Sequence, residues 1–280
     1  MWKEEDAEIQ SVEGADPGFE TVPTQALVIP PTAKRGIMIL AAFFLLQIVF
    51  AVIAGIALSV IFAVSGGNVS DSETLAANLE DNALLVNMTG TYVASIILVF
   101  WLWLKAIDPE DGISFEFLGL RQFTLVSLAK PAATGSGLGF AFLLLGGLLC
   151  EAPEGPEFGP LTTLFTASGW GLVLWAVTAL LFAPIVEELL FRSVLLKSFL
   201  QNWPSPPASL VATITTIVVF TAFHYQEFVY FPFAALAIFT MAATATYFRL
   251  KSDNLFAAVA LHFFYNFSLV LSMLLARTSV

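Results

Sequence analysis

The sequence predicts an all-α protein, a polytopic transmembrane helical bundle with about seven or eight spans. Of its 280 residues, 58% are hydrophobic and 12% are charged, and the mean hydropathy is +0.85. A soluble domain is usually about 45–50% apolar and about 25% charged. Several runs also reach the length of about 20 apolar residues that crosses a bilayer as a helix. These observations indicate an integral, multi-pass membrane protein.

Hydropathy places the expected spans along the chain. A backbone in lipid must satisfy its own hydrogen bonds, so each long apolar run is expected to be a helix. One further stretch, 106–130, is only partly apolar and is either an eighth span or a segment along the interface. The seven expected spans are residues 37–64, 84–105, 131–150, 170–195, 208–225, 229–248 and 255–276.

The chain is expected to begin with an acidic tail. Residues 1–36 are polar, contain proline and lack the apolar region of a signal peptide, which predicts a disordered cytoplasmic tail. Residues 37–280 then form the transmembrane domain. The net charge of -11 makes nucleic acid an unexpected partner. The lone cysteine, Cys150, cannot form an internal disulfide and is expected to be a packing residue.

Lysine and arginine predict the orientation of the chain. Lys34 and Arg35 precede the first span, whereas the loops at 65–83 and 151–168 contain neither residue type. Basic residues flank cytoplasmic loops in membrane proteins, so the N-terminus is expected in the cytoplasm. The lipid bilayer is the expected environment, and the bacterial cell (inner) membrane is the expected location.

Two acids and an arginine interrupt the fourth span, in the stretch APIVEELLFRSVLLKSFL. Each ionisable group costs about 2.5–3.5 kcal/mol on insertion scales and usually faces a cavity or a partner. Glu188 and Arg192 are four residues apart, so they lie on one helix face and are predicted to pair. Glu187 is rotated by about 100° from Glu188 and remains free to face something else.

Both histidines of the chain lie in or near later spans. His224 lies near the end of the fifth expected span, and His262 is four residues before Asn266 in the last one. If the chain turns near Pro204, a rise of about 1.5 Å per residue brings Glu187 and His224 to similar depths on neighbouring helices. Counted in the same way along the last span, the depth of His262 agrees less well with that of Glu187 and His224.

A carboxylate beside imidazoles and an amide suits hydrolysis. Glu187 can take a proton from water with the help of His224, either directly or through a shared metal ion. His262 and Asn266 can donate to the oxyanion that forms on an attacked carbonyl. The candidate ligands of such a metal, zinc being the expected ion, are Glu187, His224 and His262. No HExxH motif is present, so a zincin-like site is not supported.

Three motifs in order carry a family resemblance. EExxxR at 187–192, FxxxH at 220–224 and HxxxN at 262–266 resemble the CAAX-processing and bacteriocin-processing intramembrane endopeptidases. This family is also called CPBP or Abi, and is related to the Ras-converting CAAX protease. The resemblance covers about 118–276, the expected catalytic region, including part of the stretch FLGLR at 117–121.

The resemblance implies a helical fold with a water-filled intramembrane cavity open to the cytoplasm. It implies a glutamic-type or metallo endopeptidase that cleaves membrane-associated peptides or proteins, such as CAAX-like or leader peptides. Its motifs give catalytic roles to Glu187, His224, His262 and Asn266, and supporting roles to Glu188 and Arg192.

Other protein classes and plainer interpretations also compete for these residues. Ser136 in ATGSGLGF is a poor candidate for a rhomboid-type nucleophile, because small residues there more simply allow close helix packing. No aspartate lies in a predicted span, which argues against an aspartyl protease. A proton-coupled transporter is an alternative, although no inverted repeat is visible. A non-catalytic scaffold or immunity protein of the same fold is another. The Glu188–Arg192 pair is also consistent with a purely structural role, and Phe220 is consistent with a packing role.

Overall fold

The computed structural model describes residues 31–149 and 170–277. Within them the chain is helical, and seven helices are long and apolar enough to cross a membrane by length and composition. The predicted multi-pass helical bundle is confirmed. The described part contains no eighth span, because 106–107 and 125–130 are the ends of two long helices and only short helical turns lie between them. Most of the predicted tail, and Cys150, fall outside the described residues.

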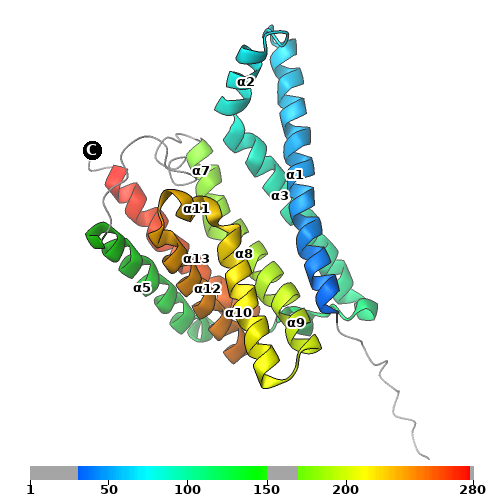
Figure 1. Cartoon of the computed structure of the whole chain (residues 1–280), viewed down its shortest axis with the longest axis vertical. Coiled ribbons are helices and arrows are strands. Elements are labelled where there is room, and N and C mark those ends of the chain that lie inside the picture. The colour runs from blue at the N-terminus through cyan, green and yellow to red at the C-terminus, as the bar shows by residue number, and fades with distance from the viewer. Residues whose placement is uncertain (1–30, 150–169, 278–280) are drawn as a thin grey trace, which may run out of the picture.

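The long helices form two groups (Figure 1). The first two run side by side and extend beyond the rest of the bundle, joined by the short helix α2 (Ser72–Asp81). The turns in 106–130 are η1 (Pro109–Asp111) and α4 (Phe115–Leu118). The short helix α11 (Tyr225–Tyr230) links two spans. The long helices are α1 (Ala33–Val64), α3 (Ala83–Ile107), α5 (Leu125–Leu149), a composite helix over 170–202, α10 (Pro206–Phe223), α12 (Phe233–Ser252) and α13 (Leu255–Arg277).

Helix α13 packs against α5 at unusually close range. A Cβ atom added at Gly135 would overlap the carbonyl oxygen of Leu261, and one added at Gly139 would come 2.7 Å from the Cβ of Ser268. Small residues are what allow two membrane helices to approach in this way. Gly135 and Gly139 therefore serve packing, as the sequence suggested, and they fix α13 beside α5.

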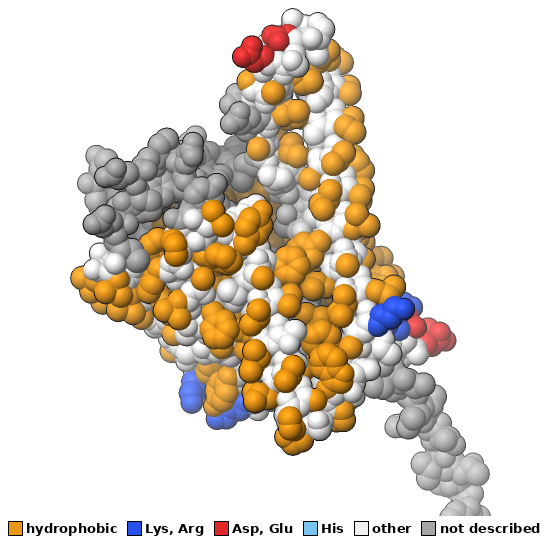
Figure 2. Space-filling model, in the orientation of Figure 1, with side chains coloured by type: hydrophobic (Ala, Val, Ile, Leu, Met, Phe, Trp, Pro, Cys, Tyr) orange, Lys and Arg blue, Asp and Glu red, His pale blue; other side chains and the backbone are white. Residues whose placement is uncertain are grey.

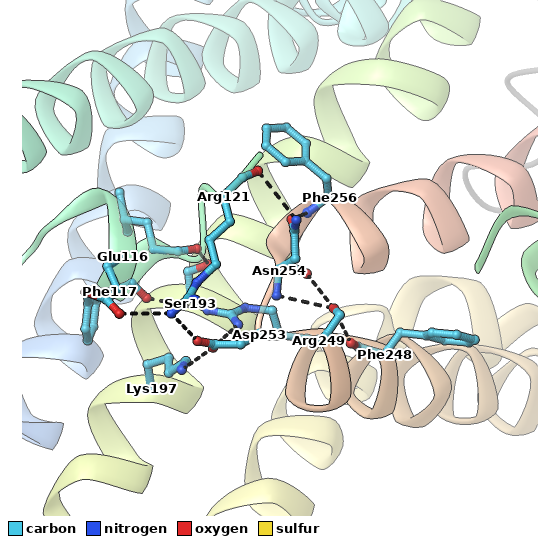
Figure 3. Close-up of polar contacts among 12 residues, drawn as sticks. Glu116, Phe117, Arg121, Ser193, Lys197, Phe248, Arg249, Asp253, Asn254 and Phe256 are labelled. Carbon is cyan, nitrogen blue, oxygen red and sulfur yellow. Dashed lines mark hydrogen bonds and ion pairs between the residues drawn. The ribbon is translucent and has the colours of Figure 1, made fainter. Parts of the chain in front are cut away.

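Basic side chains gather at the end of the bundle opposite α2, here called the basic edge (Figure 2). At this edge Asp253 contacts three cations, Arg121, Lys197 and Arg249, at 2.7, 2.6 and 2.8 Å (Figure 3). These four residues are called the Asp253 cluster. Partial burial raises the pKa of the Asp253 carboxyl, but hydrogen bonds from Lys197 and Arg249 outweigh it and leave the pKa below its usual value.

The Asp253 cluster also sets the depth of the motif residues. Lys197 lies nine residues after Glu188 on the composite helix, and Asp253 lies nine residues before His262. Because Lys197 and Asp253 are in contact, counting inward along both helices brings Glu188 and His262 to one depth, roughly 13–14 Å from the edge. The mismatch expected for His262 disappears because the composite helix continues to Asn202.

Candidate active site

The helix that carries both glutamates contains two π-helical turns. Pro184 accounts for the first turn, because proline has no N–H to donate within a helix. The Ala183 N–H donates instead to the carbonyl of Thr178, five residues earlier. Turns of this kind often lie at functional sites. The segments of the composite helix are α7 (Trp170–Val177), η2 (Thr178–Phe182), α8 (Ala183–Glu188), η3 (Leu189–Leu195) and α9 (Leu196–Asn202).

The first π turn creates the anchor for Asn266. In a regular α-helix the Ala179 carbonyl would accept from the N–H of Ala183, but here that N–H donates to the Thr178 carbonyl. In a π-helix the donor to Ala179 would be residue 184, which is proline and has no N–H. Asn266 supplies the missing donor, since its Nδ2 donates to the Ala179 oxygen at 2.8 Å. An amide group has two N–H donors, so one remains for another partner.

Glu187 and His224 meet across two helices. The Nε2 atom of His224 lies 3.5 Å from Oε2 of Glu187, which is long for a hydrogen bond. Nδ1 of His224 lies 2.9 Å from the Phe220 carbonyl oxygen, and since a carbonyl only accepts, Nδ1 carries the hydrogen. Nε2 therefore faces the carboxylate. The buried Oε2 atom makes no hydrogen bond with any described residue, while the Glu187 side chain as a whole is 25% exposed.

Glu188, Arg192, His262 and Phe220 form a second, buried group, here called the Glu188 cluster. Nδ1 of His262 donates to Oε1 of Glu188 at 2.9 Å. Arg192 lies 3.1 Å from the same oxygen as an ion pair without hydrogen-bond alignment, which confirms the pairing predicted from spacing. The Arg192 side chain also donates to the Ala242 carbonyl and lies 4.1 Å from the centre of the Phe220 ring. Phe220 thus does more than fill space, because its ring faces a buried cation.

Two cavities meet at Glu187. One, of about 360 Å³, is lined by residues of α1 and α3 on its far side, and the other, of about 320 Å³, is lined by residues of α12 and α13. Glu187, His224 and Thr178 line both cavities, and His262 and Asn266 line the second. The four residues predicted to be catalytic therefore all line the second cavity.

Sequence reasoning missed a third acid in this space. Glu227, on α11, lines both cavities together with Glu187 and His224. It is three residues after His224, and its backbone N–H donates to the His224 carbonyl at 3.1 Å. That spacing was visible in the sequence, but Glu227 lay in a predicted connection between spans and not inside one.

An apolar groove runs along the outside of the first cavity. It has a volume of about 610 Å³ and lies between α3 and the composite helix. Its walls are large apolar side chains, among them Phe100, Trp103 and Ile185, that are 44–56% exposed. The groove and the first cavity share Ser95, Phe182 and Val186, so the two are neighbours.

The candidate metal ligands do not form a ligand group. Glu187, His224 and His262 were expected to converge, but each histidine is paired with a different glutamate. Among the residues that the structure describes, no three His, Cys, Asp or Glu side chains are placed to hold a metal ion. These residues therefore do not fit a shared ion in this arrangement, and no step below depends on one.

The long apolar helices indicate an integral, multi-pass membrane protein whose internal cavities are lined by carboxylate, imidazole and amide side chains. Residues 169–268 match the family model described as Rce1-like: Type II CAAX prenyl endopeptidase Rce1-like. This match confirms the family resemblance that the three motifs indicated, and it supports protease activity of the CAAX type at the level of the family. Searches of curated proteins and of solved structures found no match.

Proposed function

We propose that the chain is an intramembrane endopeptidase in which Glu187 activates water. The main support is that Nε2 of His224 lies 3.5 Å from the Glu187 carboxylate, beside a cavity that His262 and Asn266 also line. A water held by the Glu187 carboxylate and Nε2 of His224 gives one proton to the carboxylate, and its oxygen attacks the peptide carbonyl carbon. Glu187 then returns the proton to the leaving nitrogen as the C–N bond breaks.

His262 and Asn266 are proposed to stabilise the oxyanion of the tetrahedral intermediate. The second N–H of Asn266 remains after its bond to Ala179. Nδ1 of His262 is committed to Glu188, so donation to the oxyanion uses Nε2 and requires the imidazolium form. The Glu188 carboxylate is the buried counter-charge of that imidazolium. Glu188 and Arg192 thus position His262 and do not contact the reacting atoms.

The proposed substrate is a membrane-associated peptide or protein of the CAAX type. The family match supports this class, and the apolar groove beside the first cavity is a suitable surface for the apolar part of such a substrate. The basic edge is proposed to face the cytoplasm, because lysine and arginine gather there.

The test uses purified protein in lipid vesicles and a prenylated CAAX peptide with an internally quenched fluorophore. Glu187→Gln should lower the cleavage rate by about 10²–10⁴-fold, the usual contribution of a general base. Glu73→Gln is the matched control, because Glu73 is exposed on α2 and lines neither cavity. Undiminished cleavage by the Glu187 variant, in protein that is folded normally, would show that the proposed role is wrong.

A further inference from the structure

The wall that faces Glu187 in the first cavity comes from the N-terminal helices. Gln47 of α1 and Thr91 and Ser95 of α3 line this cavity together with Glu187. All three lie outside residues 169–268, the part of the chain that matches the family model. Polar side chains in the middle of membrane helices are uncommon and usually face a partner or a cavity.

The polar side chains around this cavity differ in how many of their hydrogen-bond donors and acceptors are already occupied. The Thr91 hydroxyl donates to the Asn87 carbonyl at 3.1 Å and accepts from Gln47 at 3.4 Å, so its only donor is used. On the opposite side, Thr178 donates to the Leu174 carbonyl and contacts the Tyr92 hydroxyl at 2.7 Å. Neither threonine therefore has a hydroxyl hydrogen left to donate to a ligand.

Ser95 and Gln47 differ from the threonines. Ser95 is 2% exposed, and its hydroxyl makes no hydrogen bond with any described residue. Gln47 uses one N–H on Thr91, and its amide makes no other hydrogen bond within the described ranges. Gln47 is partly buried, but Ser95 is fully buried, and a buried polar group left unpaired is costly and calls for an explanation, such as a bound ligand.

A peptide inside the membrane supplies the missing partners. Each peptide unit carries an N–H and a C=O that must be hydrogen-bonded away from water. A serine hydroxyl and a glutamine amide each offer both a donor and an acceptor, which matches such a chain. Ser95 also lines the apolar groove, so it stands where a substrate would pass from the groove to Glu187.

We propose that Ser95 and Gln47 bind the main chain of the substrate opposite Glu187, so that α1 and α3 form the substrate-binding wall of the site. This proposal rests on the proposed endopeptidase function and assigns it two further positioning residues. It predicts that removing the Ser95 hydroxyl weakens substrate binding without weakening the fold. The reason is that this hydroxyl has no described partner to lose in the free protein.

The test is carried out in the Glu187→Gln background, so that binding is measured without turnover. The Kd of a fluorophore-labelled prenylated CAAX peptide is measured for three proteins. These are the Glu187→Gln variant alone, the same variant with Ser95→Ala, and the same variant with Gln47→Met. Each added variant should raise Kd about tenfold, the effect of losing one hydrogen bond. Ser59→Ala is the matched control, because the Ser59 hydroxyl donates to Gly55 on its own helix and lines neither cavity.

The outcomes separate this proposal from the previous one. Equal Kd values for Ser95→Ala and Ser59→Ala would overturn the binding wall, as would a peptide that does not bind the Glu187→Gln protein at all. A lower melting temperature for Ser95→Ala than for Ser59→Ala would also overturn it, because the hydroxyl would then be structural. If the peptide binds as expected but unsubstituted protein never cleaves it, the binding wall stands and the endopeptidase proposal fails.

Discussion

The Asp253 cluster and the Glu187–His224 pair use ionic groups in opposite ways. Asp253 is held by three cations at 2.6–2.8 Å, whereas Oε2 of Glu187 makes no hydrogen bond with any described residue and lies 3.5 Å from its histidine. A carboxylate with all its partners in place stabilises a fold. A carboxylate with capacity left over, beside a cavity, costs stability and is available to a ligand. The difference separates residues that hold the bundle together from residues that can act on a substrate.

The Glu188 cluster lies between these extremes, and breaking it should have the largest effect on folding. Arg192→Ala leaves Glu188 buried without its arginine, which should lower the free energy of unfolding by about 3–5 kcal/mol. Denaturant unfolding in detergent measures this loss. The double variant Glu188→Gln with Arg192→Met removes both charges and should recover most of the stability.

The double variant also sharpens the distinction between support and chemistry. If Glu188 positions His262, the double variant should regain its stability but cleave the substrate more slowly than unsubstituted protein, because His262 has lost its charged partner. A double variant that is both stable and fully active would mean that the Glu188 cluster is only structural. An Arg192→Ala protein with unchanged stability would contradict the buried ion pair itself.

The sequence predicted well whatever depended on local helix geometry. Four-residue spacing was enough to pair Glu188 with Arg192 and to turn Glu187 away, and counting along a hairpin brought Glu187 to His224. Hydropathy placed the seven spans because a backbone in lipid has almost no other choice. The roles of the motif residues remain predictions.

What depended on contacts between distant segments could not be predicted. Nothing in the sequence tied Asp253 to Lys197, so the common depth of Glu188 and His262 was not expected. The π turn before Pro184, which frees the Ala179 carbonyl for Asn266, needs a three-dimensional account of which N–H meets which oxygen. Polar residues such as Ser95 gain their meaning only from the cavity that they line.

Removing the charge at the basic edge should have a moderate effect. Asp253→Asn loses three ion pairs but keeps a residue that tolerates the left-handed backbone at this position, where φ is 47°. Because the Asp253 side chain is 37% exposed, solvent screens these pairs, and we expect a loss of about 1–2 kcal/mol. Thermal unfolding of both proteins at neutral pH measures it.

The same variant should respond differently to acid. The folded-state pKa of Asp253 is lowered, so its contribution is present above the unfolded pKa of about 3.9 and is lost as the pH falls through the lower folded value. The stability gap between unsubstituted protein and Asp253→Asn should therefore shrink as the pH is lowered from about 7 to about 3. A constant gap would show that the aspartate acts by shape and not by charge.

The smallest expected effect comes from removing one cation of the three. Lys197→Met keeps most of the apolar stem of a side chain that is 23% exposed and removes only its ammonium group. Arg121 and Arg249 still contact Asp253, so the loss of stability should stay below about 1 kcal/mol, and the depth of Glu188 relative to His262 should be kept. The melting temperature and the cleavage rate should both stay near those of unsubstituted protein. Lys105→Met, which removes an ion pair with Asp111 at the same edge, is the matched comparison. A loss as large as that of Asp253→Asn would mean that Lys197 alone carries the cluster and that the two arginines contribute nothing to it.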